Sequence, residues 1–115
     1  MKVRDFAANL GLRLLTGESG LDKEVSGMYI CDLLSWVMSH ADKQNAWVTV
    51  HTHLNIVAVA LLTEVSCIIV PENIQVEEAT ISKAVEEGVP ILGTDMNSYE
   101  LSCRAYQMFS DTAGS

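Results

Sequence analysis

Side chains that can bind ligands or move protons follow several predicted strands of this chain. The ligand-binding candidates are Asp32, His51, Thr52, His53, Thr94 and Asp95. Imidazole and carboxylate groups could hold a divalent metal or serve as an acid–base pair, and hydroxyl groups could orient a small ligand. These groups can act together only if the fold brings the ends of their strands to one edge.

Each of these residue types also has a structural role. His51 and His53 alternate on an extended segment, which sends their rings to opposite faces, so we favour capping or packing over metal binding. Asp32 is interpreted as the N-cap of the following helix rather than as a general base or metal ligand. Cys31 has no His or second Cys nearby in the sequence and is expected to be an inert buried thiol. We therefore predict no catalytic residue and no metal site.

A glycine-rich turn at residues 17–20 could cradle a phosphate through backbone N–H groups, but a plain turn is the favoured interpretation. The chain contains no Gly-Lys pair and so has no P-loop for phosphoryl transfer. We predict no cofactor and no enzymatic activity. Two alternatives stay open: a protein-interaction subunit without a ligand, and a small enzyme that uses His51 or His53 with Asp32 or Asp95.

Composition and charge exclude several classes of function. Hydrophobic residues make up 49% of the 115 residues and charged residues 19%, which indicates one compact globular domain. The formal net charge is −8 and the seven lysines and arginines are dispersed, so neither nucleic acid nor a membrane surface is an expected partner. The amino terminus lacks a signal-peptide pattern, and a cytoplasmic location is expected. Three cysteines without a Cys-x-x-Cys pair predict reduced, mostly buried thiols.

Hydrophobic periodicity predicts alternating helices and strands. Helices are expected at residues 2–10, 32–40, 54–62, 77–87 and 97–109, and strands at residues 12–15, 25–30, 46–50, 66–70 and 89–93. Helices between strands require crossovers, which predicts a mostly parallel sheet. The first strand reaches the next through a short loop, so we expect an antiparallel pair there and a mixed sheet. The predicted architecture is a three-layer α/β/α domain with five strands over residues 1–109, followed by a frayed tail at 110–115.

The predicted topology also says where ligands and partners would bind. In an open parallel sheet, ligands collect beyond the carboxyl ends of the strands, so the candidate residues should meet at one edge. The strongly apolar helix at 54–62 must be covered. We expect its buried residues to be Leu54, Ile56, Val57, Ala60 and Leu61. Trp36 is a candidate interface anchor.

Two stretches of the chain resemble the DRTGG domain, a module appended to several bacterial and archaeal regulatory enzymes. The name-giving positions of that family fall on Asp22, Lys23, Ser26, Gly27 and Met28. This chain has Lys where the family motif has Arg, Ser where the motif has Thr, and Met where the motif has its second Gly. The stretch 29–38 and the helix at 55–60 are better preserved. The resemblance extends over roughly residues 1–106.

The resemblance implies a regulatory or assembly module that forms a homodimer and serves a partner enzyme. It also implies a distant likeness to the amino-terminal domain of the HPr serine kinase/phosphorylase, whose P-loop domain has no counterpart here. Met28 fills space where a backbone could otherwise approach a ligand, and Lys23 lacks the planar fork of arginine. We therefore predict a non-catalytic regulatory or ligand-sensing module that binds a small metabolite or nucleotide.

Overall fold

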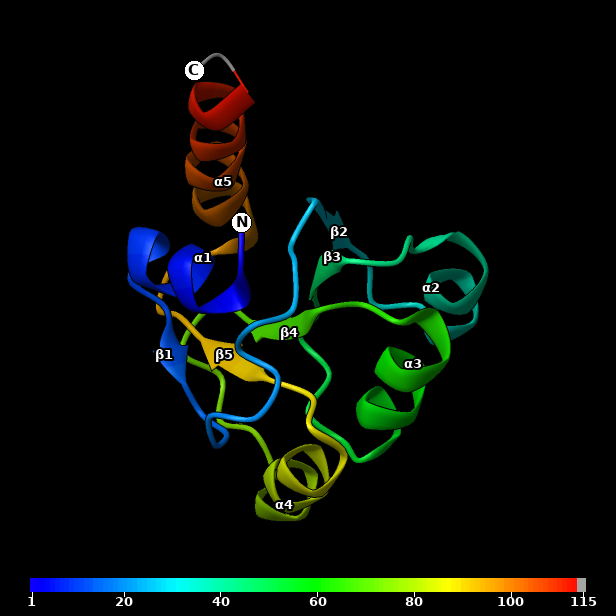
Figure 1. Cartoon of the computed structure of the whole chain (residues 1–115). Coiled ribbons are helices and arrows are strands. Elements are labelled where there is room, and N and C mark those ends of the chain that lie inside the picture. The colour runs from blue at the N-terminus through cyan, green and yellow to red at the C-terminus, as the bar shows by residue number, and fades with distance from the viewer. Residues whose placement is uncertain (114–115) are drawn as a thin grey trace.

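The chain folds into a mixed five-stranded sheet between two layers of helices (Figure 1). The structure is a computed structural model that describes residues 1–113, with side chains through Asp111. The strands are β1 (Arg13–Leu14), β2 (Gly27–Ile30), β3 (Asn45–Val48), β4 (Cys67–Val70) and β5 (Ile91–Gly93). The helices are α1 (Val3–Leu10), α2 (Leu34–His40), α3 (Asn55–Thr63), α4 (Glu78–Glu87) and α5 (Ser98–Ala113). The predicted α/β class is confirmed, with element ends shifted by a few residues.

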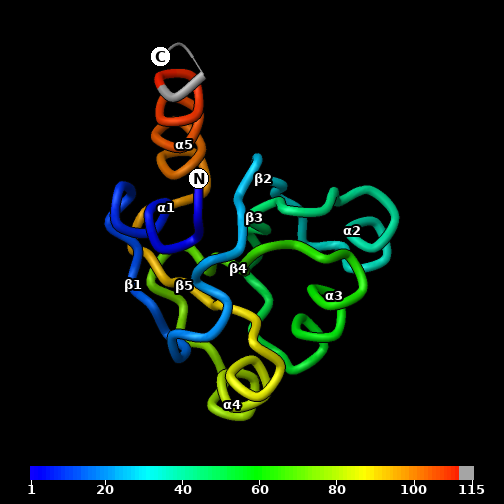
Figure 2. Tube along the Cα trace, viewed as in Figure 1, coloured from blue at the N-terminus to red at the C-terminus, as the bar shows by residue number. Residues whose placement is uncertain are grey.

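The strand order is β1-β5-β4-β3-β2, and the strands from β2 to β5 run parallel. β1 pairs antiparallel with β5, with Arg13 opposite Gly93. The prediction that the first strand pairs with the next one along the chain is therefore wrong, since β1 and β2 lie at opposite edges (Figure 2). The placement of α1 explains this pairing. α1 packs against α5, with the rings of Phe6 and Phe109 5.8 Å apart, and so holds β1 beside the strand that leads into α5.

Each face of the sheet is covered by its own group of helices. α2, α3 and α4 cover one face, where the buried ring of Trp47 clusters with Ile56 and Ile68. α1 and α5 cover the other face, where Phe6 clusters with Ile69. β3 and β4 are buried along their whole length, as expected for strands with helices on both sides. The predicted three-layer arrangement is confirmed.

The ends of the helices follow local sequence signals. Gly11 after α1 and Gly88 after α4 adopt φ values of 66° and 69°, the left-handed conformation that glycine reaches without strain. At the start of α5, Asn97 Oδ1 accepts a hydrogen bond from the Glu100 N–H at 2.9 Å, as a capping side chain does. α5 continues to Ala113, so residues 110–113 of the predicted frayed tail are helical. Residues 114–115 lie outside the described part of the chain.

α3 is more exposed than its apolar sequence predicts. Ile56, Val57 and Ala60 are buried, but Leu54 is 38% exposed and Leu61 is 44% exposed. The prediction that both leucines are internal is wrong, because α3 packs on the sheet through one side and its outer side meets solvent. Within residues 1–113, no helix combines the length and the apolar character needed to cross a bilayer.

The three cysteines differ in exposure. Cys67 in β4 is buried, Cys31 is half-buried and Cys103 on α5 is exposed. Burial raises the pKa of the Cys67 thiol from 9.0 to about 12. The unfolded chain therefore releases this proton first, and the contribution of Cys67 to stability is lost as the pH rises from 9.0 toward 12.

We expect a thiolate-directed reagent at neutral pH to label Cys103 quickly and Cys67 only when the chain unfolds, because the thiolate is the nucleophile. Timed labelling followed by peptide mass spectrometry measures both rates. The Cys103→Ser variant is the control that removes the fast site. Labelling of Cys67 at the rate of Cys103 in the folded chain would contradict the buried position of β4.

Candidate functional site

Asp32 and His51 lie together at the carboxyl ends of β2 and β3. Asp32 Oδ1 accepts hydrogen bonds from the Thr49 hydroxyl at 2.8 Å and from the Val50 N–H at 2.9 Å. The His51 ring donates from Nε2 to the backbone carbonyl oxygen of Asp32 at 2.5 Å. The imidazole thus contacts the main chain of Asp32, and the carboxylate is occupied by a hydroxyl and a backbone donor.

Asp32 does not cap α2, and the N-cap prediction is wrong. The N-cap residue is Leu33, whose side chain makes no capping hydrogen bond, and α2 begins at Leu34. Asp32 stands one position too early to reach the free N–H groups of the first turn. Its carboxylate turns instead to the end of β3 and ties the β2 corner to the β3 corner.

We expect Asp32→Ala to lower the free energy of unfolding by about 1–3 kcal/mol, because the buried Thr49 hydroxyl and the Val50 N–H lose a charged acceptor. Asp32→Asn keeps one oxygen acceptor and should cost less. Chemical denaturation measures both changes. The exposed Asp42 carboxylate is the matched control, and an equal loss in Asp42→Ala would contradict the role given to Asp32.

Thr52 and His53 serve the loop after β3. The carbonyl oxygen of Thr52 accepts a hydrogen bond from the buried Thr80 hydroxyl at 2.7 Å, and its own hydroxyl lies 3.5 Å from a Glu77 carboxylate oxygen. His53 Nδ1 accepts the Asn55 N–H at 3.3 Å, at the start of α3. Within the described residues, no group of three or more His, Cys, Asp or Glu side chains is arranged to hold a metal ion.

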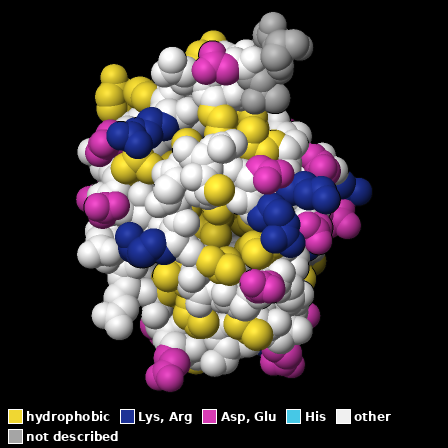
Figure 3. Space-filling view, turned by 60° about the vertical axis from the view of Figure 1, so that its left-hand side comes forward, with side chains coloured by type: hydrophobic (Ala, Val, Ile, Leu, Met, Phe, Trp, Pro, Cys, Tyr) yellow, Lys and Arg dark blue, Asp and Glu magenta, His cyan; other side chains and the backbone are white. Residues whose placement is uncertain are grey.

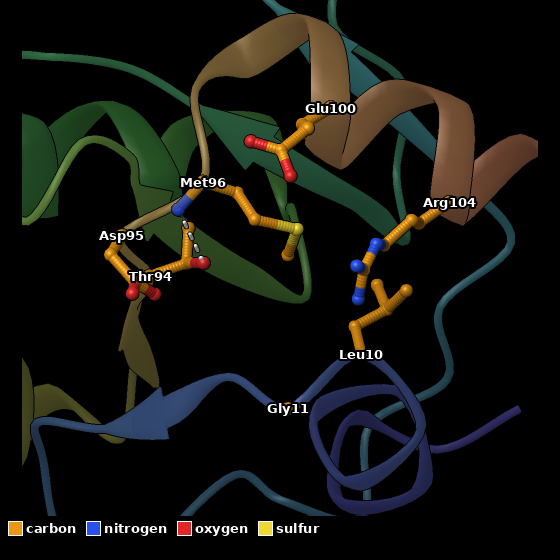
Figure 4. A pocket seen from close by; sticks show the side chains of 7 residues that line it. All are labelled: Leu10, Gly11, Thr94, Asp95, Met96, Glu100 and Arg104. Atoms are coloured by element: carbon orange, nitrogen blue, oxygen red, sulfur yellow. Dashed lines mark hydrogen bonds between the residues drawn. The ribbon is translucent and has the colours of Figure 1, made fainter.

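Thr94 and Asp95 line a pocket of about 360 Å³ between the end of α1 and the start of α5 (Figure 4). The lining residues are Leu10, Gly11, Thr94, Asp95, Met96, Glu100 and Arg104. The Thr94 hydroxyl accepts the Met96 N–H at 3.1 Å and so fixes the turn that leads into α5. Figure 4 shows Met96 between Thr94 and the two charged side chains of α5, with Leu10 and Gly11 on the opposite wall. The six candidates therefore divide between the β2–β3 corner and this pocket.

The loop after β4 supports the main chain of the pocket. The Glu72 N–H donates to the Met96 carbonyl at 2.9 Å, and the Asn73 N–H donates to the Thr94 carbonyl at 2.7 Å. Glu72 and Asn73 have φ values of 59° and 55°, which cost free energy in residues other than glycine. Arg13 reinforces this loop, because its guanidinium donates to Asn73 Oδ1 at 2.8 Å. The pocket backbone is therefore held by hydrogen bonds to the neighbouring loop.

Several residues of the pocket were not identified from the sequence. Glu100 and Arg104 are one helical turn apart, a visible spacing that places them on one face of α5. Leu10 and Gly11 carried no such signal, because they reach the pocket only through the packing of α1 against α5. On the face shown in Figure 3, hydrophobic side chains form a central band and the basic side chains stand toward its margins.

The first two family-motif positions join separate parts of the fold. Arg4 Nε donates to Asp22 Oδ1 at 3.0 Å, and Lys23 Nζ donates to the Gly88 carbonyl at 3.0 Å. The Arg4 guanidinium, by this hydrogen bond, holds the pKa of Asp22 below its usual value. The segment before β2 is thereby attached to α1 and to the end of α4.

The remaining motif positions lie where the parallel strands begin. The Ser26 N–H donates to the Gln44 carbonyl at 2.9 Å, just before β3, and Gly27 and Met28 open β2. Gln44 and Gly88 precede β3 and β5, so these contacts lie at the amino ends of the strands. The motif therefore lies at the amino ends of the parallel strands, and the pocket and the Asp32 corner lie at their carboxyl ends.

The comparisons with known proteins agree on one family. The sequence profile of the DRTGG domain matches residues 5–108, and no curated protein matches the chain. The fold is similar to the crystal structure of the CBS and DRTGG domains of the regulatory region of Clostridium perfringens pyrophosphatase, complexed with the activator diadenosine tetraphosphate. The TM-score is 0.71 at 11% identity, and the match covers 90% of this chain and 45% of that one, so the chain spans less than half of that structure. Since the family profile covers nearly all of the domain, the chain belongs to the DRTGG domain family.

Proposed function

We propose that this domain is a non-catalytic regulatory module that binds a small metabolite or nucleotide and signals its presence to a partner enzyme. The observation that carries the proposal is the pocket at the carboxyl end of β5, where polar and apolar side chains from α1 and α5 converge (Figure 4). Ligands of open α/β sheets collect at this end of the strands. The volume of about 360 Å³ falls within the roughly 300–1,000 Å³ of small-molecule sites.

The geometry favours binding over catalysis. A small enzyme that used His51 with Asp32 would need the imidazole and the carboxylate within hydrogen-bond reach. The His51 ring instead donates a hydrogen bond to the Asp32 backbone carbonyl, while the Asp32 carboxylate accepts hydrogen bonds from the Thr49 hydroxyl and the Val50 N–H. Asp95 lines a pocket whose lining includes neither histidine nor cysteine.

The solved relative supports a regulatory role. That structure is the regulatory region of a pyrophosphatase, bound to a nucleotide activator. A domain of the same fold and family could bind a ligand without transforming it. The ligand would influence the enzyme if it binds two states of that enzyme with different affinities. The partner enzyme is therefore part of the proposal.

A thermal-shift screen with adenine nucleotides, amino acids and small organic acids tests ligand binding. A ligand at 100 times its Kd stabilises the folded state by about 2.7 kcal/mol, which raises the melting temperature by several degrees. Sodium chloride at matched ionic strength is the control, because salt alone screens the net charge of −8. A panel that produces no shift at millimolar concentration would contradict the proposed function.

We also propose that the domain forms a homodimer through the free edge of β2 and the adjoining face of α5. A groove there is lined by Met28, Ile30, Ser102, Ala105, Tyr106 and Phe109. Ile30 is 45% exposed and Tyr106 is 75% exposed, and within residues 1–113 β2 has a neighbouring strand on one side only. Two copies that each carry a net charge of −8 repel at a charged interface, whereas this groove is lined by uncharged side chains.

Sedimentation at micromolar concentration tests the dimer. We expect a species of twice 12.6 kDa for the wild-type chain and a monomer for Tyr106→Glu, which buries a charge in the interface. Tyr99, 79% exposed on α5 but outside the groove, is the matched control, and Tyr99→Glu should remain a dimer. A wild-type chain that sediments as a monomer would contradict this part of the proposal.

A further inference from the structure

Arg104 differs from every other basic side chain of the protein. The remaining lysines and arginines each have a polar partner: Lys2 and Arg4 pair with Asp22, Arg13 with Asn73, Lys23 with Gly88, Lys43 with Glu64, and Lys83 with Glu86 and Glu87. The Arg104 guanidinium makes no hydrogen bond or ion pair with any residue in 1–111, although the chain carries more than twice as many acids as bases. Its guanidinium lines the pocket beside Leu10 (Figure 4).

The pocket also contains two acidic side chains without a side-chain partner among the described residues. Glu100 stands one turn before Arg104 on α5, a spacing that commonly gives an ion pair, yet no such pair is formed. Asp95 lies at the β5 end of the same pocket. Opposite charges thus line one concave site without neutralising each other.

Apolar side chains complete the pocket. In Figure 4, Met96 lies between the charged groups and Leu10 lies beside Arg104. A flexible methionine can adapt to the shape of a bound molecule. The volume of about 360 Å³ is near the lower end of the roughly 300–1,000 Å³ of small-molecule sites, which indicates a ligand much smaller than a dinucleotide.

We propose that this pocket binds a small zwitterion of the amino-acid type, with its anionic group on Arg104 and its ammonium group between Asp95 and Glu100. This inference rests on the proposed function and specifies its ligand. A planar guanidinium can bind a carboxylate through two parallel hydrogen bonds, and a carboxylate pair suits an ammonium group. A polyphosphate would meet one cation and two anions in this pocket, so the charge pattern disfavours it.

Calorimetric titration of the full chain with the common free amino acids tests the inference. Each amino acid that binds is compared with its amide, which lacks the carboxylate, and with the corresponding acid, which lacks the amine. AMP provides the nucleotide arm. We expect Arg104→Gln to weaken binding of the amino acid about tenfold or more, and Asp95→Asn or Glu100→Gln to weaken it similarly. Arg104→Lys should restore part of the affinity.

The control variants separate a local effect from a loss of folding. Arg104, Asp95 and Glu100 are exposed, and their side chains have no polar partner within residues 1–111, so their variants should melt at the wild-type temperature. Lys43→Gln removes a basic charge outside the pocket, at a surface pair with Glu64, and should leave affinity unchanged.

The possible results distinguish this inference from the proposed function. Binding of AMP but of no amino acid would contradict the zwitterionic ligand, while it would still agree with a regulatory module that binds a nucleotide. Amino-acid binding that is unaffected by the Arg104 and Asp95 variants would overturn the choice of pocket. If no compound of either class binds, this inference fails, and the proposed function fails as well when the wider thermal-shift panel also produces no shift.

Discussion

Replacing Trp47 with alanine is expected to lower the free energy of unfolding by about 3–5 kcal/mol. Trp47 is fully buried in the cluster beneath α2, α3 and α4, and its indole N–H donates to the Cys31 carbonyl at 3.0 Å. The truncation opens a cavity in the core and leaves a partly buried carbonyl without its donor. Urea denaturation followed by circular dichroism measures the change.

Two further variants separate the contributions of Trp47. Trp47→Phe keeps an aromatic ring and removes the donor, so its cost should be about 1–3 kcal/mol. Trp36 is the matched control, since it is 50% exposed and stacks on His40 with the ring centroids 3.8 Å apart. Trp36→Ala is expected to cost about 0.5–1.5 kcal/mol. An equal loss in Trp36→Ala and Trp47→Ala would show that the core is not centred on Trp47.

The second large loss of stability is expected when Gly20, in the turn before the family motif, is replaced by alanine. A Cβ at this position would lie 2.5 Å from the Gly88 carbonyl oxygen and 3.0 Å from a Pro90 ring carbon, and the φ of +87° disfavours any L side chain. Left-handed strain of about 1–2 kcal/mol and overpacking of about 1–3 kcal/mol together predict a loss of roughly 2–5 kcal/mol for Gly20→Ala. Thermal and chemical denaturation measure this loss.

Gly11 is the matched control for Gly20. Its φ is +66°, but a Cβ there would meet nothing within 4 Å. Gly11→Ala should therefore show the strain alone, about 1–2 kcal/mol. If the two alanine variants are equally stable, the close packing of the 17–20 turn against the end of α4 is wrong.

The order and type of the elements could be predicted from the sequence because the signals are local. Gly11 and Gly88 mark helix ends, and the continuous apolar run in β4 is typical of a strand buried on both faces. The acidic charge with dispersed cations also leads to the expectation that neither nucleic acid nor a membrane surface is a partner.

The pairing of β1 and the role of Asp32 could not be predicted, because both depend on contacts between distant segments. β1 lies beside β5 since α1 packs on α5, a contact between the two ends of the chain. Asp32 resembles an N-cap in sequence, but Thr49 and Val50 provide donors that only the parallel pairing of β2 with β3 brings near.

The candidate site was predicted only in part for the same reason. The rule that ligands collect at the carboxyl ends of strands identified Thr94 and Asp95, both of which line the pocket. The rule could not show that His51 lies outside the pocket, where its ring donates a hydrogen bond to the Asp32 carbonyl in the β2–β3 corner. Arg104 was not identified, because the sequence cannot show that its guanidinium has no polar partner within residues 1–111.

The most direct test of the ligand site is an amide NMR titration of the full chain with a compound that raises its melting temperature. We predict the largest shift changes at Leu10 and Gly11, at residues 94–96 and around Arg104, with little change at residues 22–28. The largest changes at residues 22–28, or at Asp32 and His51, would contradict the placement of the ligand site between α1 and α5.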